Sequence, residues 1–206
     1  MVKIAAIVLA AGRSTRFAAA GGTGATKLTA PLAGKPLARY AAEAALASSA
    51  RPIVVVTGHA RSAVEAALRG LSLQFAHNPD FAAGLSTSLR TGLAALPEDA
   101  AGAVVLLADM PAVRPSLIDQ LIAAFAKQPS ALAAAPTQDG RRGNPILLAR
   151  ALIPAVADIQ GDEGARRLLA VLPPGRLLEV PVDDKSVNLD IDTPDALAAA
   201  APLLKI

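Results

Sequence analysis

The sequence predicts an α/β protein with a doubly wound, mixed but mostly parallel sheet and helices on both faces. Short apolar, β-branched runs alternate with longer segments of helical period. The apolar runs are nearly continuous, which is typical of strands covered on both faces. Polar, glycine-bearing segments follow the first four runs. Because the carboxyl ends of parallel strands share one edge of a sheet, we expect these segments to form a ligand site there.

Each predicted element has a local reason. The strands are short runs of valine, isoleucine, leucine and alanine: Ile4–Leu9, Ile53–Thr57, Leu73–Ala76, Val104–Leu107 and Leu132–Ala135. The helices carry apolar residues at helical spacing: Pro36–Ser48, Ser62–Leu68, Ser86–Leu96, Pro115–Ala126 and Pro194–Leu204. The first turn of a helix tolerates proline, which suits Pro36, Pro115 and Pro194. Hydroxyl side chains favour N-cap positions, and the candidates are Ser62, Ser86 and Thr193.

The pattern changes after residue 136. A polar turn over 137–143 precedes a strand at Ile146–Leu148 and a further helix. The last predicted strands, Leu177–Val182 and Val187–Ile191, come before the final helix. No internal repeat or long linker divides the chain, so we expect a single domain over residues 1–206.

Composition excludes several classes of function. The chain has no cysteine, which rules out disulfides, zinc–thiolate sites and cysteine nucleophiles. The net charge is +3 with scattered Lys and Arg, so a nucleic-acid-binding surface is not indicated. Every apolar run is shorter than the roughly 18–20 residues that a membrane span needs. We expect a cytoplasmic protein that contacts neither nucleic acid nor membrane.

The loop after the first strand is suited to a nucleotide. It opens with small residues that let the backbone approach a flat base or a phosphate, namely Leu9, Ala10, Ala11 and Gly12. Arg13 and Arg16 offer guanidinium groups to phosphate oxygens, and Lys27 adds a point charge. Taken alone, these arginines are equally compatible with solvated residues beside a flexible turn.

Two familiar glycine motifs do not apply to this loop. The run Gly21–Lys27 lacks the Gly-Lys-Ser/Thr ending of a phosphate-binding loop and does not directly join a strand to a helix. The dinucleotide-binding Gly-x-Gly-x-x-Gly is also absent after the first strand.

Carboxylates are predicted at the same edge of the sheet. Asp109 follows the strand Val104–Leu107, where a carboxylate beside a triphosphate suits Mg²⁺. The alternative is that Asp109 forms a turn or caps a helix. Asp190 and Asp192 alternate at the end of a predicted strand and should share one face. Asp192 could instead interact with the dipole of the last helix.

Polar residues after the second and third strands are candidates for contact with a base and ribose. Thr57 and Gly58 would line the base pocket through backbone groups. Asn78 offers both a donor and an acceptor, enough to read a pyrimidine edge. Ser86 and Ser88 lie in the next polar segment, where Ser86 could also act as a cap.

These motifs together resemble a known superfamily. Leu9-Ala10-Ala11-Gly12-x-Ser14-x-Arg16 followed by Lys27 resembles the signature of MobA-like nucleotidyltransferases, which have a glycosyltransferase-A-like, nucleotide-diphospho-sugar-transferase-like fold. Further matches run along the chain: Thr57-Gly58-His59, Gly84-Leu85-Ser86-Thr87-Ser88, Asp109-Met110-Pro111, Gly143-Asn144-Pro145, Gly161-Asp162-x-Gly164-Ala165-Arg166 and Asp190-Ile191-Asp192-Thr193-Pro194. Within the superfamily the chain looks most like the molybdenum cofactor cytidylyltransferases.

The resemblance implies transfer of CMP from CTP to the terminal phosphate of molybdopterin, with release of pyrophosphate. Asp109 and Asp192 would hold Mg²⁺, and Arg13, Arg16 and Lys27 would stabilise the phosphates. Residues 1–112 would be the nucleotide-binding half and 113–206 the acceptor-binding half. The implied acceptor-binding residues are Arg142 (or its neighbour Arg141), Asn144, Asp162 and Arg166. The implied protein partner is a molybdenum hydroxylase or its chaperone.

Several alternatives stay open. GTP is the nearest rival nucleotide, although the resemblance favours CTP because Ala11 stands where guanylyl-transferring relatives tend to have glycine. The acceptor could be another small phosphorylated molecule, or the protein could be a non-catalytic cofactor-binding chaperone. The family's lysine usually comes sooner, so the insertion over 18–26 leaves Lys35 as runner-up to Lys27. Asp162 could instead cap the helix that contains Arg166.

Overall fold

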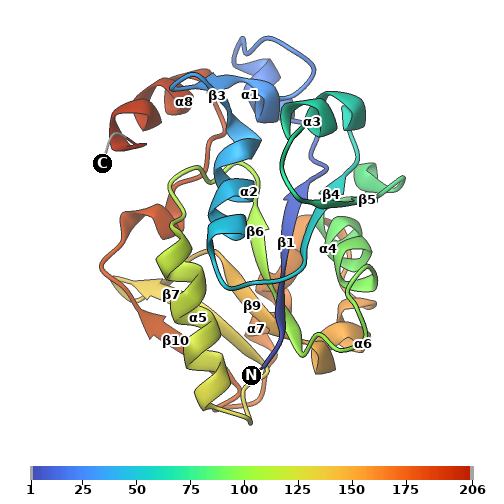
Figure 1. Ribbon diagram of the computed structural model, residues 1–206, viewed down its shortest axis with the longest axis vertical. Helices are drawn as coiled ribbons and strands as arrows, with labels where there is room; N and C mark the ends of the chain where they lie inside the picture. The colour runs from blue at the N-terminus through green and yellow to red at the C-terminus, as the bar shows by residue number, and fades with distance from the viewer. Residues whose placement is uncertain (1, 205–206) are drawn as a thin grey trace.

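The computed structural model describes residues 2–204, apart from the side chains of Glu163, Lys185, Ser186 and Leu203. Its central sheet has the strand order β10-β7-β9-β6-β1-β4-β5, with β8 paired to β7 (Figure 1). These strands are β1 Ile4–Ala10, β4 Ile53–Thr57, β5 Gln74–His77, β6 Gly102–Leu107, β7 Ala133–Gln138, β8 Arg141–Arg142, β9 Ile146–Ala149 and β10 Leu177–Pro181. The short strands β2 (Pro31–Leu32) and β3 (Lys35–Pro36) form a separate antiparallel pair.

The strand directions confirm a mixed, mostly parallel sheet. Strands β6, β1, β4 and β5 form one group that is parallel throughout, and β7 and β10 form a second parallel pair. Strand β9 is antiparallel to both β6 and β7, and it joins the two parallel groups. In the register of β1 and β6, Leu9 lies opposite Leu107. The loops that follow these two strands therefore begin side by side.

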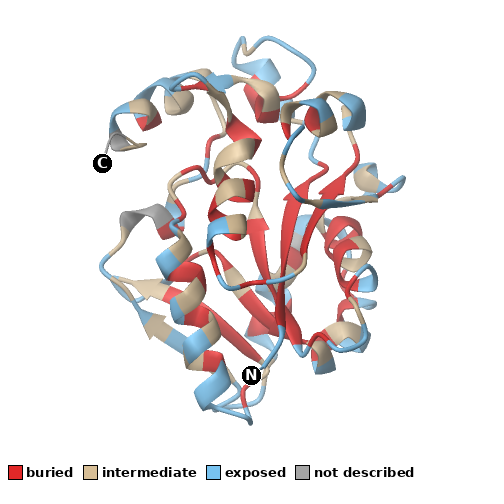
Figure 2. Cartoon of the chain, viewed as in Figure 1, coloured by how far each residue is buried: buried red, intermediate tan, exposed pale blue. Residues whose placement is uncertain are grey.

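Helices cover both faces of the sheet, as a doubly wound fold requires. On β1, Ile4, Ala6 and Val8 face one apolar core, whereas the alternate residues face the other. The first face is covered by α2 (Leu37–Ala47), α3 (Arg61–Ala67) and α5 (Pro115–Lys127). The second is covered by α4 (Leu85–Ala94), α6 (Ile153–Val156) and α7 (Gly164–Ala170). Figure 2 shows that the buried residues concentrate in the central strands between these layers.

The predicted strand at Val187–Ile191 is wrong. Residues Lys185–Asn188 form a 3-10 turn, and the segment that follows is irregular. Val187 and Ile191 are both fully buried, which explains the strand-like apolar pattern. They are buried without sheet pairing: the Val187 carbonyl accepts from the Asn144 N–H at 2.8 Å, and the Ile191 N–H donates to the Asp109 carbonyl at 3.0 Å.

Two of the three predicted caps are also wrong. Ser62 and Ser86 lie inside α3 and α4, whose N-caps are Ala60 and Gly84. Both cap residues have positive φ angles, and neither of them caps its helix with a side-chain hydrogen bond. Thr193 does cap α8 (Pro194–Ala200), because its hydroxyl accepts from the Ala196 N–H at 3.1 Å.

Short elements at the start of the chain escaped the sequence prediction. Helix α1 covers Thr15–Ala19, and a 3-10 turn covers Lys27–Thr29. Pro36 ends β3 and caps α2 instead of lying inside its first turn, whereas Pro115 and Pro194 do begin their helices. Elements this short carry too few residues for apolar periodicity to reveal them.

The C-terminal helix α8 docks on a small apolar cluster of its own. Ile191 and Ala200 pack there with Leu32 and Leu37 from β2 and α2. Figure 1 shows α8 beside β3, at the end of the molecule where α1 lies. This docking fixes the segment that carries Asp190 and Asp192. Among residues 2–204, no helix is both long and apolar enough to cross a bilayer.

Candidate active site

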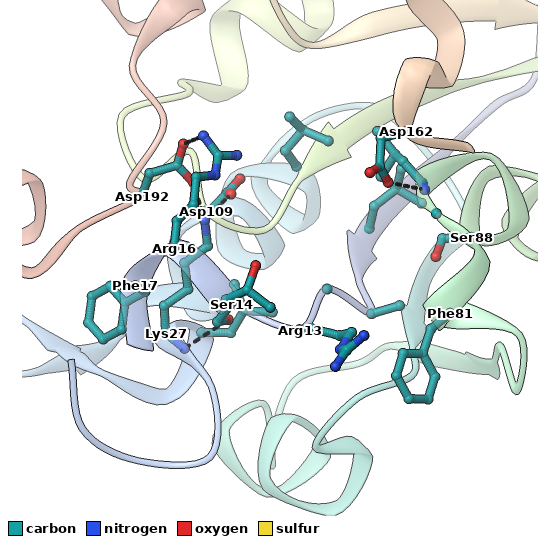
Figure 3. A pocket seen from close by; sticks show the side chains of 18 of the residues that line it. Arg13, Ser14, Arg16, Phe17, Lys27, Phe81, Ser88, Asp109, Asp162 and Asp192 are labelled. Carbon is teal, nitrogen blue, oxygen red and sulfur yellow. Dashed lines mark hydrogen bonds and ion pairs between the residues drawn. The ribbon is translucent and has the colours of Figure 1, made fainter. Parts of the chain in front are cut away.

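A pocket of about 530 Å³ opens where β1 and β6 end (Figure 3). Its walls come from segments far apart in the sequence: the loop after β1, the end of β6, the start of the 3-10 turn Lys27–Thr29, the start of α4 and the segment before α8. The predicted residues that line it are Leu9, Ala11, Gly12, Arg13, Arg16, Lys27, Ser88, Asp109, Asp162 and Asp192. The polar loops therefore converge on one edge of the sheet, as the strand-end rule predicts.

The loop after β1 is closed by Ser14. This residue has a φ of 54°, a left-handed conformation that is uncommon outside glycine. Its hydroxyl lies 2.9 Å from the Thr26 hydroxyl and accepts from the Lys27 N–H at 3.1 Å. The inserted residues 18–26 therefore bulge outward while both ends of the loop stay joined. Lys27 reaches the pocket for this reason, despite the insertion before it.

Lys35, the runner-up, lies elsewhere. Its ammonium contacts Glu43 at 2.6 Å and lies over the ring of Tyr40, 4.5 Å from the centroid. Neither partner lines the pocket. Of the two lysines, the structure brings only Lys27 to the predicted site.

Lys27 lies between two carboxylates. Its Nζ is 2.7 Å from Asp109 Oδ2 and 2.9 Å from Asp192 Oδ1, and only 9% of the residue is exposed. The guanidinium of Arg16 contacts the other oxygen of Asp192. Figure 3 shows Arg16 and Lys27 reaching toward the same pair of acids. The site therefore holds two cations and two anions in direct contact.

The pKa shifts follow from this contact. Burial by itself lowers the pKa of Lys27, but attraction and hydrogen bonds to Asp109 and Asp192 outweigh it and raise the pKa. Burial would raise the pKa of Asp192, but Lys27 and Arg16 hold it below the usual carboxyl value. The pKa of Asp190 is raised, first by burial and then by repulsion from Asp192 and Asp109. Lys27 and Asp192 are therefore charged at neutral pH.

The acidic pair fits a divalent cation. Asp109 Oδ1 is buried and has no hydrogen-bond partner, an arrangement that costs free energy unless something else binds it. Asp109 and Asp192 already share one cationic atom, the Lys27 Nζ. Within the described part of the chain, no three His, Cys, Asp or Glu side chains form a metal cage. Mg²⁺ needs no such cage, because it takes one or two carboxylates together with phosphate oxygens and water.

Five of the predicted nucleotide-binding residues lie behind the pocket wall and do not line it: Ala10, Thr57, Gly58, Asn78 and Ser86. Asn78 is the clearest case, since it is only 1% exposed. Its Nδ2 donates to the hydroxyls of Thr87 at 2.8 Å and Ser88 at 3.0 Å, and its Oδ1 accepts from the Asp80 N–H at 3.0 Å. Asn78 therefore positions Ser88, which lines the pocket, and its amide is not turned toward a ligand.

Gly58 has no side chain, and this lets two residues of the pocket wall pack closely against it. A Cβ at Gly58 would lie 2.6 Å from the Cβ of Phe81 and 2.8 Å from that of Ala11, closer than packed side chains approach. Phe81 and Ala11 both line the pocket, so Gly58 lets the two surfaces close together. Sequence reasoning missed Phe81 and also Leu85 and Leu107, because apolar residues carry no chemical signature that separates a pocket wall from a core.

A second pocket, of about 540 Å³, adjoins the first. It contains the four predicted acceptor residues Arg142, Asn144, Asp162 and Arg166, together with Arg167 and an apolar wall. The two pockets share the residues Leu9, Leu85, Leu107 and Asp162. Arg141 does not line either pocket, whereas its neighbour Arg142 lines the second. Arg142 also forms an ion pair with Glu179, with 2.6 Å between Nε and Oε1.

Asp162 joins the two pockets through α4. Its Oδ1 accepts from the Leu85 N–H at 3.1 Å, so it binds the first turn of α4 across the pocket junction. Gly84 and Gly161 pack so closely that a Cβ on Gly84 would lie 2.5 Å from the Gly161 carbonyl carbon. Helix α7, which carries Arg166, is thereby fixed against the helix that carries Ser88.

The fold and the paired pockets define an α/β domain of the nucleotide-diphospho-sugar-transferase-like class. The model of the MobA-like NTP transferase domain matches residues 6–179. The chain belongs to this family.

Two relatives differ in how much of their length the chain covers. It is 30% identical over 196 residues to nicotine blue oxidoreductase of Paenarthrobacter nicotinovorans, covering 92% of each chain. It is 32% identical over 130 residues to the bifunctional protein GlmU of Syntrophotalea carbinolica. That match covers 63% of this chain and 27% of GlmU, so the chain spans about a quarter of the length of this relative.

Solved structures share the fold. The Mycobacterium tuberculosis protein Rv0371c, in a complex with manganese, has a TM-score of 0.77 and 27% identity, with 97% of this chain and 98% of that chain covered. Molybdopterin-guanine dinucleotide biosynthesis protein A of Archaeoglobus fulgidus has a TM-score of 0.72 and 21% identity over 97% of this chain and 98% of that chain.

Proposed function

We propose that this protein is a nucleotidyltransferase that transfers CMP from CTP to the terminal phosphate of a molybdopterin-type acceptor and releases pyrophosphate. One observation carries the proposal. A polar pocket with paired carboxylates and cations adjoins a second, arginine-bearing pocket, and the two share a wall. Two substrates bound in these pockets would meet at that wall, which is what direct group transfer requires.

The first pocket supplies groups for a nucleoside triphosphate. Ala11 and Gly12 bring the backbone to the base end, and Arg13, Arg16 and Lys27 offer cations to the phosphates. Ala11 and Phe81 both pack against Gly58 and line this pocket. Their side chains occupy space that a purine would need more than a pyrimidine, which supports CTP over GTP.

The second pocket suits a flat, partly apolar molecule that carries a phosphate. Its wall includes Leu89, Ile146 and Leu169, which favour a ring system, while Arg142 and Arg166 favour an anion. A pterin with a terminal phosphate has this combination. A molybdenum hydroxylase or its chaperone would be the protein that receives the product.

Mg²⁺ would be held by Asp109 and Asp192, and the manganese complex of Rv0371c supports a divalent cation in a protein of this fold. When bound, the ion would offset the negative charge that develops on the phosphates. An oxygen of the acceptor phosphate attacks the α-phosphorus of CTP, and the bond to the β-phosphate oxygen breaks. Arg16 and Lys27 stabilise the departing pyrophosphate. The attacking phosphate is already ionised at neutral pH, so positioning and electrostatics suffice without a general base.

The test is a pyrophosphate-release assay with the purified protein, Mg²⁺, molybdopterin and either CTP or GTP. We expect pyrophosphate with CTP and the acceptor together, and little with GTP. Release with GTP and the acceptor, but not with CTP, would overturn the nucleotide assignment. Release only with another phosphorylated acceptor would overturn the acceptor assignment. Binding of molybdopterin without any release would indicate a cofactor-binding chaperone.

The variant Asp109→Ala tests the metal assignment in the same assay. Removing one carboxylate from the cation site should lower turnover by a factor of about 10² to 10³ or more, the loss seen when one electrostatic group is removed from an active site. Its circular dichroism spectrum should match that of the wild type. Turnover at the wild-type rate in a folded Asp109→Ala protein would rule out the metal assignment.

A redox activity is the second candidate, because the relative covered over 92% of its length is named an oxidoreductase. The apolar second pocket would then hold a conjugated electron acceptor rather than a phosphorylated one. Oxidation of NADH or NADPH in the presence of a conjugated dye, with no pyrophosphate release from CTP or GTP, would favour this candidate over the first.

A further inference from the structure

Lys27 occupies the position between the two carboxylates that the proposed function assigns to a divalent cation. Its ammonium contacts Asp109 Oδ2 at 2.7 Å and Asp192 Oδ1 at 2.9 Å. The remaining oxygen of Asp192 is taken by Arg16. Of the four oxygens that could bind a cation, only Asp109 Oδ1 has no partner, and it is buried. The protein's own cations therefore hold the oxygens that a metal would need.

Because these side chains are largely buried, a divalent cation that displaces Lys27 from the carboxylates meets a cost in free energy. The side chain of Lys27 is only 11% exposed, and those of Asp109 and Asp192 are 20% and 23% exposed. Lys27 and Arg16 neutralise the two carboxylates that they contact. A divalent cation that entered on its own would meet a positive charge at close range, in surroundings where charges are screened less than in water.

A triphosphate is the natural alternative partner for the same two cations. Arg16 and Lys27 line the pocket in which the triphosphate would bind. The side chain of Arg16 is 76% exposed, and lysine has a long flexible stem, so both can change partners without movement of the backbone. As each cation turns to a phosphate oxygen, it releases a carboxylate oxygen.

We propose that Lys27, assisted by Arg16, is a built-in counter-ion that keeps the metal site closed until a triphosphate draws it away. The divalent cation and the nucleotide then bind together, and the cation alone binds weakly. This inference rests on the proposed function for the identity of the nucleotide. The closed carboxylate pair itself is a property of the unliganded chain and can be tested without turnover.

The test is a titration of the protein with Mn²⁺ alone, in which the electron paramagnetic resonance signal reports the free ion. Lys27→Met should bind Mn²⁺ at least about tenfold more tightly than the wild type, because a charge within 4 Å of the site is removed. Lys35→Met is the control, since it breaks another lysine–carboxylate pair, with Glu43, outside the pocket. Its Mn²⁺ affinity should equal that of the wild type. Lys27→Arg, which keeps the charge, should also stay close to the wild type.

Nucleotide coupling is measured on the wild type in the same way. Mn²⁺ should bind more tightly in the presence of CTP than the protein-free mixture of Mn²⁺ and CTP accounts for, and CTP affinity should rise by the same factor in the presence of Mn²⁺. The coupling should shrink in Lys27→Met. If that variant does not fold, Arg16→Met replaces it, because the exposed Arg16 side chain contributes little to packing.

Equal Mn²⁺ affinities for the wild type and folded Lys27→Met would overturn the inference, even if CTP binds and pyrophosphate is released. Tighter binding of Mn²⁺ by Lys27→Met would support the closed site, even if neither CTP nor GTP binds. Failure of both CTP and GTP to bind would rule out the proposed function, but the metal site blocked by Lys27 would still stand. The two proposals therefore fail on different measurements.

Discussion

Glu43 lies outside the pocket, and it too is held in place by ion pairs with cationic side chains. It accepts from Lys35 at 2.6 Å and from Arg39 at 3.1 Å, and Arg39 in turn donates to the Ala67 carbonyl at 3.2 Å. Burial by itself would raise the pKa of Glu43, but the hydrogen bonds and attraction from Lys35 and Arg39 outweigh it and lower the pKa. This carboxylate therefore links β3, α2 and the end of α3.

Glu43→Gln should destabilise the protein at neutral pH. The folded pKa of Glu43 lies below its unfolded value near 4.5, so its ionised form stabilises the fold above that pH. The stabilisation is lost as the pH falls through the folded pKa. We expect a loss of roughly 0.5–1 kcal/mol at pH 7, in the range of exposed ion pairs, that disappears in acid. Urea unfolding of both proteins across a pH series measures it, and a difference independent of pH would contradict the assignment.

At the scale of elements, the segment before α8 shows how a helix positions a site residue. Thr193 caps α8, Ile191 is buried beneath it, and Asp192 between them faces Arg16 and Lys27. Alternating apolar and polar residues predict a strand here, but Ile191 is buried by α8 and β2, and Val187 is buried beside Gly143, both without sheet pairing. The placement of Asp192 therefore depends on the docking of the helix.

Thr193→Ala should weaken this docking. Loss of an N-cap hydroxyl typically costs about 1 kcal/mol, and the amide of Ala196 loses its acceptor. Hydrogen exchange should become faster in α8 and stay unchanged in β1. Mn²⁺ affinity in the presence of CTP should fall, because Asp192 is held less firmly. Thr193→Ser keeps the hydroxyl and should behave as the wild type; faster exchange in both variants would show that the methyl group, not the cap, matters.

At the scale of the whole molecule, the sheet joins the two predicted halves of the chain. Strand β6 from the first half pairs with β9 from the second, and each large apolar core contains residues from both halves. The pocket likewise takes Lys27 from one half and Asp192 from the other. A functional division at residue 112 stays a prediction, but the packing gives neither half a core of its own.

Unfolding should therefore be a single cooperative transition. Tyr40, the sole tyrosine in a chain without tryptophan, reports on α2, whereas far-ultraviolet circular dichroism reports on all elements. The two urea curves should coincide. Leu121→Ala, which removes a fully buried side chain from α5, should lower the free energy of unfolding by about 2–5 kcal/mol. Both urea curves should therefore move together to lower urea concentration. Separate midpoints for the two signals would show that the halves unfold independently.

The sequence was sufficient for features that local pattern controls. The main strands and helices follow from apolar periodicity, and the meeting of Arg16, Lys27 and Asp109 follows because loops after parallel strands share an edge. Other features depend on packing. Asn78 and Ser86 carry the expected chemistry, but only packing reveals that both are buried behind the wall.

The sequence by itself determined the fold class, the polar edge of the sheet and the charged residues gathered there. Only the tertiary structure decided that Lys27 and not Lys35 reaches the pocket, that Asp162 binds the first turn of α4, and that two pockets share a wall. The physical reason is distance along the chain. The contact between Lys27 and Asp192 spans 165 positions, and no local pattern records which distant side chain will satisfy a buried charge.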